Sequence, residues 1–262
     1  MERTVILASR QDEAGINIIT NLRKFSPGAD ILELDEDIVD AEGVPDALEP
    51  RPGLAIFASR HSSESGRPCL TAHFPGNFSR ALYGGQAGRV SMAAPFALKY
   101  AMKYLREFSR DQSYELTVEA THHGPLTDVP CFFIEIGSSP SEWRDPVAGE
   151  TIARVIHRLL KSSPATGPVG VGFGGPHYSR GFTDLVTSTG YSISHVVPKY
   201  NVPLLDEELL ARLFQRSIPA AGPAILDWKG IRGEDRRYLV RNLERLGIEV
   251  LRLRRILADS RG

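Results

Sequence analysis

The chain has 262 residues, of which 42% are apolar and 24% are charged, and its formal net charge is -1. These values are typical of a globular protein with a sizeable core, and they argue against a disordered or membrane-embedded chain. The only two cysteines are too few for a disulfide framework and lack the paired spacing of a cysteine zinc site.

Short apolar runs that indicate buried strands alternate along the chain with stretches of helical periodicity. We expect strands at residues 4–9, 29–35, 53–59, 115–121, 131–137, 169–173, 191–197, 224–228 and 248–253. We expect helices at residues 11–25, 92–108, 147–162, 206–217 and 233–247. The alternation predicts one α/β domain over residues 1–262, with a mostly parallel, mixed sheet between two helical layers.

Two segments depart from this alternation. Residues 60–91 hold a Gly-Gly pair and two proline-linked turns, which predicts a long ordered loop with a function rather than a domain linker. Residues 228–262 carry ten Lys or Arg against five Asp or Glu. Such a basic segment can contact a polyanion, although a solvated helix and strand would show the same charge pattern.

No secretory signal is visible near the start of the sequence, and no apolar run reaches the length of a transmembrane helix. We therefore expect an intracellular, cytoplasmic protein that makes no contact with a membrane.

Histidines gather at the expected ends of strands. His61, His122, His123 and His177 each lie just past an apolar run, and His73 lies in the long loop. In open α/β sheets ligands bind beyond the carboxyl ends of the strands, so we expect these side chains at one edge. His195 lies inside an expected strand, which favours a buried structural or supporting role.

The stretch EATHHGP is the most concentrated of these groups. With the two-residue period of a strand, Glu119 and Thr121 share a face. Consecutive residues of an extended strand point apart, so His122 and His123 can serve one site only if the chain leaves strand geometry there. The Gly-Pro pair that follows makes such a departure feasible.

The stretch GFGGPHYSRGF, residues 172–182, supplies a second element. Its small residues allow close approach of a backbone to a ligand, which suits a phosphate or oxyanion loop. The spacing matches neither the P-loop nor the dinucleotide fingerprint, and the chain has no G-x-S-x-G elbow and no H-E-x-x-H helix. Cys131 opens an apolar run and His157 lies in a helix, so both are expected to be structural.

Five motifs occur in order along essentially the whole chain: SRHSSESG, AHFPGNF, EATHHGP, GVGFGGPHYSRGFTDL and SHVVPKY. Together they resemble the archaeal-type D-aminoacyl-tRNA deacylases, which also occur in plants. The resemblance implies hydrolysis of the ester that joins a D-amino acid to the terminal ribose of tRNA, mainly recognised at its acceptor end. It also implies zinc dependence, a monomer, and an α/β/α fold similar to peptidyl-tRNA hydrolases and the phosphorylase/hydrolase group.

Roles for the candidate residues follow from this resemblance and from the chemistry of ester hydrolysis. The expected catalytic residues are Glu119, His122, His123 and His177. The expected substrate-binding residues are His61, Asn77, Thr121, Gly174, Gly175, Tyr178 and Lys199, with backbone amides around the two glycines facing the oxyanion. The expected zinc ligands are His73, His122 and His177, and a metal-free site with a histidine as general base is the alternative.

Two other functional classes fit part of the pattern. A metal-dependent amidohydrolase or peptidase acting on small substrates would use the same His/Glu residues. A non-catalytic tRNA-binding module would explain the basic segment and the loops but not the imidazoles beside a carboxylate.

Overall fold

The computed structural model describes residues 3–25, 28–64, 66–110, 113–162 and 166–260. The strands are β1 (Thr4–Ser9), β2 (Asp30–Leu34), β3 (Leu54–Ser62), β4 (Cys69–His73), β5 (Gly76–Asn77), β6 (Arg89–Val90), β7 (Glu115–Val118), β8 (Cys131–Ser138), β9 (Val169–Phe173), β10 (Ser192–Val197), β11 (Ala224–Leu226) and β12 (Val250–Arg252). The helices are α1 (Glu13–Arg23), α2 (Pro95–Phe108), α3 (Pro140–Trp143), α4 (Pro146–Leu160), α5 (Arg180–Ser188), α6 (Glu207–Gln215), α7 (Gly233–Arg245) and α8 (Leu253–Asp259), with 3-10 turns η1 (Ile38–Asp40), η2 (Pro45–Ala47) and η3 (Val202–Leu204).

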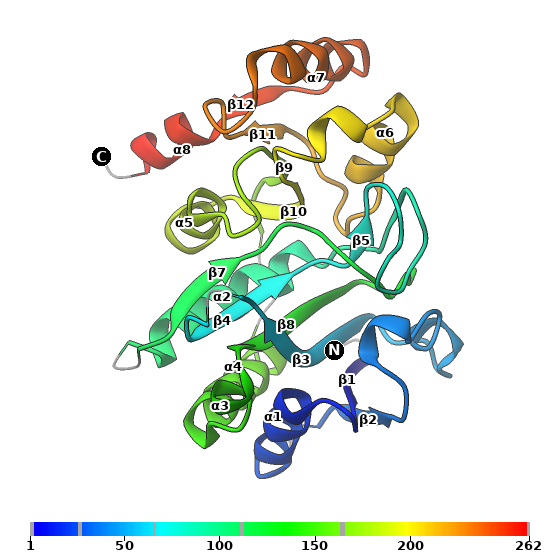
Figure 1. Cartoon of the computed structure of the whole chain (residues 1–262), viewed down its shortest axis with the longest axis vertical. Coiled ribbons are helices and arrows are strands. Elements are labelled where there is room, and N and C mark those ends of the chain that lie inside the picture. The colour runs from blue at the N-terminus through cyan, green and yellow to red at the C-terminus, as the bar shows by residue number, and fades with distance from the viewer. Residues whose placement is uncertain (1–2, 26–27, 65, 111–112, 163–165, 261–262) are drawn as a thin grey trace.

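The strands form two larger sheets and a short β5-β6 pair (Figure 1). The first sheet has the order β2-β1-β3-β8-β4-β7, and all its pairings are parallel except the antiparallel pairing of β4 with β8. The second sheet, β10-β9-β11-β12, is entirely parallel. The predicted α/β class with a mostly parallel, mixed sheet is therefore confirmed, and the strands are divided between two sheets.

The segment expected as a long loop contains three strands. β3 continues to Ser62 in register with β8, so His61 lies within a strand and not after it. β4 then runs back along β8, and it ends at His73. The expected loop was wrong in this part because β4 has only five residues and is defined by its pairing with β8, which leaves no periodic signal in the sequence.

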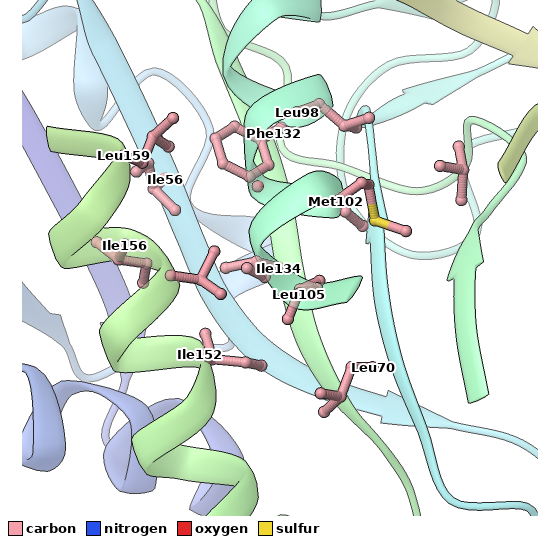
Figure 2. Packing of buried hydrophobic residues seen from close by; sticks show 14 of the residues in the cluster. Ile56, Leu70, Leu98, Met102, Leu105, Phe132, Ile134, Ile152, Ile156 and Leu159 are labelled. Carbon is pink, nitrogen blue, oxygen red and sulfur yellow. The ribbon is translucent and has the colours of Figure 1, made fainter. Parts of the chain in front are cut away.

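Helices cover one apolar face of the first sheet. The other face packs against the segment that holds η1 and η2. Figure 2 shows side chains of α2 and α4 packed against the strands of the first sheet. The labelled side chains are Ile56, Leu70, Leu98, Met102, Leu105, Phe132, Ile134, Ile152, Ile156 and Leu159. α2 also contacts α5 and β10, so the same apolar cluster extends toward the second sheet.

The residues expected to be structural lie in ordinary packing positions. Cys131 is fully buried, and burial raises the pKa of its thiol, so the prediction of an unreactive cysteine is confirmed. His157, on α4, packs its ring against Phe25. None of the helices in the described part of the chain is long and apolar enough to span a bilayer.

Replacing Phe132 by alanine should lower the free energy of unfolding by about 3–5 kcal/mol, since the ring is fully buried and the smaller side chain leaves a cavity. Denaturant unfolding monitored by circular dichroism measures the difference. Leu82 is 74% exposed, so Leu82→Ala is the control and should change stability by less than about 0.5 kcal/mol. Equal losses in both variants would contradict this description of the core.

Candidate active site

The residues that follow β7 join the two sheets. The amide of Glu119 donates to Ala72 O at the end of β4, at 3.1 Å. The next amide, of Ala120, donates to His177 O at 2.8 Å, and the segment pairs in antiparallel fashion between Glu119 and Tyr178. This pairing brings Glu119 of the first sheet beside His177 of the second.

Two glycines turn the chain from β9 toward this junction. Gly174 and Gly175 have φ values of 98° and 76°, which favour glycine. A Cβ atom on Gly174 would lie 2.6 Å from a side-chain carbon of Ile231. Their amides already donate to Val197 O at 2.8 Å and Gly230 O at 3.2 Å. The expected contact with an oxyanion is therefore wrong for these two amides themselves, and the glycines shape the turn.

The two consecutive histidines point toward one another. His123 has a positive φ of 42°, so the chain leaves strand geometry here, as a shared site requires. The ring centroids of His122 and His123 are 4.2 Å apart, and both rings contact His73, at 4.1 and 4.8 Å. Three imidazoles thus meet at one point.

Backbone contacts define the tautomers of this pair. His122 Nδ1 lies 2.8 Å from Ala120 O, and His123 Nδ1 lies 2.6 Å from Gly124 O. Carbonyl oxygens only accept, so both Nδ1 atoms donate, and each neutral ring keeps a lone pair on Nε2. His73 is fully buried, and neither of its ring nitrogens has a hydrogen-bond partner within the described residues. A nitrogen lone pair that accepts no hydrogen bond is free to coordinate a divalent cation.

Two buried carboxylates lie beside these rings. Glu119 Oε2 accepts from His177 Nε2 at 3.0 Å and lies 3.8 Å from His122 Nε2. Glu135, on β8, accepts from Ser59 Oγ at 2.6 Å and lies 3.7 Å from His73 Nε2. Sequence reasoning missed Glu135, although a single acidic residue in the apolar run CFFIEI was a usable signal.

His61 lies between the two carboxylates. Its Nδ1 is 3.2 Å from Glu119 Oε1 and 3.7 Å from Glu135 Oε2. Burial lowers the pKa of His61, but the two carboxylates outweigh burial and raise that pKa to about 10. Burial likewise opposes ionisation of Glu119, yet the hydrogen bond from His177 and the nearby positive charge of His61 hold its pKa well below the usual range. At neutral pH a protonated His61 therefore lies between two ionised carboxylates, and the three groups together carry a net negative charge.

The pKa values of the two consecutive histidines are lowered, in contrast to that of His61. Burial, and then the neighbouring His73, lower the pKa of His122 well below its usual range and that of His123 to about 4. Both rings are therefore neutral at physiological pH, the form that binds metals. His73 differs, because Glu135 raises its pKa despite burial.

Three groups of described residues could each hold a metal ion. Within each group, the potential ligand atoms lie within 4.8 Å of one another. The groups are His73–His122–His123, Glu119–His122–His177 and His61–Glu119–Glu135. These His/Glu groups have the composition to hold a metal ion. The expected ligand set of His73, His122 and His177 is distributed over two groups, and His122 belongs to both.

Aromatic hydroxyls surround the exposed side of the cluster. His177 Nδ1 lies 3.2 Å from Tyr200 Oη, and His61 Nε2 lies 3.1 Å from Tyr178 Oη. Tyr178 and Tyr200 are 41% and 54% exposed. Tyr200 was not singled out from the sequence, although it follows β10 within the SHVVPKY motif.

Three other candidate residues have mainly backbone partners. Asn77 is buried, and its amide group donates to Gly84 O at 3.0 Å. The hydroxyl of Thr121 accepts from the amide of Val196 at 3.1 Å. Lys199 is exposed, and its backbone amide donates to Gly175 O at 2.9 Å. Their expected contacts with substrate stay predictions.

His195 is a structural histidine within β10. It is fully buried, its Nε2 donates to Arg216 O at 3.0 Å, and its Nδ1 lies 3.3 Å from the hydroxyl of Thr121. Burial lowers the pKa of His195 to about 4, so folding favours the neutral ring. The expected structural role is confirmed.

This lowered pKa makes stability depend on pH. His195 contributes stability above its unfolded pKa of about 6.5, and the contribution is lost as pH falls toward 4. Between pH 7 and pH 4.5 the wild-type protein should lose about 2–3 kcal/mol more than His195→Gln. Denaturant unfolding at both pH values tests this, with His157→Gln as control. Identical pH dependence of wild type and His195→Gln would contradict it.

Comparison with known proteins gives concordant results. Residues 48–251 match the family model described as D-aminoacyl-tRNA deacylase. Proteins of that name from Thermococcus kodakarensis, Thermococcus onnurineus and Korarchaeum cryptofilum are 39%, 35% and 32% identical, and the alignments cover 85%, 95% and 100% of this chain and 83%, 99% and 97% of theirs. A crystal structure of AF0625, described as a conserved protein of unknown function, superposes with a TM-score of 0.93 at 30% identity and covers 98% of each chain.

Proposed function

We propose that this chain, which belongs to the D-aminoacyl-tRNA deacylase family, uses the junction of its two sheets as the catalytic site. As a member of that family it is a hydrolase of the ester bond in D-aminoacyl-tRNA. The observation that supports this location most directly is the pair of His177 and the buried Glu119, 3.0 Å apart. We further propose that the acceptor end of tRNA enters here, and that the protein acts as a cytoplasmic monomer.

The residues present fit a zinc ion at the group His73–His122–His123. The unpartnered nitrogens of His73 and the Nε2 lone pairs of its two neighbours are a suitable set of donors. Glu135 lies 3.7 Å from His73 Nε2, where a carboxylate can orient the ring and raise its basicity as a ligand. When bound, zinc would lower the pKa of a coordinated water toward about 7 and polarise the ester carbonyl.

His177 is positioned to move the proton. Glu119 accepts from Nε2, so the lone pair of the neutral ring is on Nδ1, beside Tyr200 Oη. Nδ1 takes a proton from the attacking water as its oxygen bonds to the ester carbon. The same proton is returned to the ribose oxygen when the ester bond breaks, which releases a D-amino acid and tRNA.

Tyr178 replaces the glycine amides as the donor to the oxyanion. His61 is protonated at neutral pH, and its Nε2 donates to Tyr178 Oη at 3.1 Å. That contact occupies an acceptor position of the phenol oxygen and favours an outward orientation of its own proton. A donor directed at developing negative charge lowers the barrier to ester hydrolysis.

Two substitutions separate metal binding from proton transfer. His122→Ala should lose both bound zinc and turnover, whereas His177→Ala should keep zinc and lose turnover about 100-fold or more. Zinc content by atomic spectroscopy, deacylation rates and circular dichroism are the measurements, with His157→Ala as control. Full activity in rigorously metal-free enzyme would eliminate the zinc role and leave His177 as the direct general base. Near-wild-type rates in both variants would place the site elsewhere.

The chirality of the substrate gives the sharpest test of the proposed function. A cavity of about 250 Å³, lined by His61, Cys69, Thr71, Thr117 and Tyr178 among others, opens beside the site, and we propose that it receives the side chain of the D-amino acid. D-tyrosyl-tRNA should be deacylated at least about 100-fold faster than L-tyrosyl-tRNA. In the L substrate the ester would be displaced from the catalytic groups that are aligned for the D substrate. Equal rates on the two substrates would refute chiral proofreading.

The other functional classes make different predictions. An amidohydrolase or peptidase of small substrates would neither bind tRNA nor be inhibited by it. A non-catalytic module would bind tRNA in a salt-sensitive way without releasing amino acid. Family membership favours neither alternative.

A further inference from the structure

The parallel second sheet places four chain segments along one edge. The strand order is β10-β9-β11-β12, and Tyr200, His177, Trp228 and Arg252 follow or end these strands in the same order. Neighbouring strands are about 4.8 Å apart, so the end of β12 lies about 10 Å from the end of β9. The edge that carries His177 therefore continues directly into the basic C-terminal segment.

Trp228 holds two arginines at this edge. The guanidinium carbons of Arg252 and Arg236 lie 4.2 and 4.7 Å from the centroid of its ring. Arg236 also donates to Trp228 O at 2.7 Å. Stacking on an aromatic ring orients a guanidinium without neutralising its charge, so the positive charges stay available to an anion.

The start of α8 extends the same basic surface to the His177 loop. Leu253 is buried, and its side chain lies 2.8 Å from the position of a Cβ atom on Gly181. Gly181 is in the first turn of α5, four residues after His177. This contact places Arg254 and Arg180, the neighbours of the two packed residues, at the edge that carries His177.

We call six exposed arginines the arginine strip, namely Arg180, Arg237, Arg241, Arg252, Arg254 and Arg255. Arg237 and Arg241 line one hollow with Trp228, and Arg252, Arg254 and Arg255 line a second. Within the ranges that the structure describes, only Arg255 of these six lies within 4.0 Å of a carboxylate, at 3.9 Å from Asp259. The other five arginines carry positive charge that no described carboxylate pairs with, in a chain with net charge -1, and such a surface suits a polyanion.

From this geometry we infer that the arginine strip binds phosphates of the tRNA acceptor stem and aligns the 3′ end with His177. The inference rests on the proposed function for its substrate. Contacts of this kind position the RNA and carry no sequence information, so the strip accepts many tRNAs. The shared sheet edge favours RNA over an acidic protein, because the bound polyanion must also reach the ester-hydrolysing groups.

The test compares matched pairs of arginines. Arg252→Gln with Arg254→Gln should weaken binding of deacylated tRNA about tenfold and lower the slope of log K against log salt by about 1.4–1.8, since two phosphate contacts are lost. Arg254→Gln alone, which leaves the Trp228 stack intact, should lower the slope by about half as much. The control is Arg154→Gln with Arg158→Gln on α4, where the guanidinium groups also lie over aromatic rings. The control pair should leave affinity and slope unchanged.

Two further measurements complete the test. An acceptor-stem minihelix should compete with tRNA, and kcat/KM should fall about tenfold more for D-tyrosyl-tRNA than for D-tyrosyl-adenosine, which lacks the stem phosphates. The inference is overturned if the strip variants keep the wild-type affinity and slope. It is also overturned if the control pair loses as much affinity as the strip variants, or if the minihelix does not compete with tRNA. If the wild-type protein binds tRNA through the strip without deacylating it, the proposed function is wrong and the inferred role of the strip in binding tRNA is kept.

Discussion

The site depends on the hydrogen bonds that join the residues after β7 to both sheets. Glu119 is tied through its amide to β4, and the next amide binds the backbone of His177 beyond β9. The amide of Thr121 donates to Val196 O in β10, at 2.9 Å. Because buried amides must find partners, this short polar segment holds two sheets in one arrangement and places a carboxylate where they meet.

The positions of the histidines and carboxylates where the two sheets meet determine which of these groups are charged. Glu119 and Glu135 stay ionised although they are buried, because His61 lies between them and His73 and His177 flank them. His122 and His123 stay neutral because burial and the same neighbours oppose a further positive charge. One cluster thus contains anionic, cationic and neutral groups at a single pH, and the proposed mechanism uses all three kinds.

Much of the fold was predictable from local patterns. The strands β1 and β9 coincide with their apolar runs at 4–9 and 169–173, and helices such as α4 follow the spacing of their apolar residues. β4 was not predictable, because pairing with β8 defines it. Glu135 was missed for a related reason: its carboxylate gains a role only from rings that lie on other strands.

The α/β class, the family motifs and the identity of most groups in the candidate site could be read from local patterns in the sequence. The arrangement of these groups depends on the three-dimensional fold. It turned His122 and His123 toward His73 through the positive φ of His123, engaged the amides of Gly174 and Gly175, and set Thr121 between the sheets. Local periodicity reports which residues are apolar, whereas partners distant in sequence decide whether a polar group is free to meet a substrate.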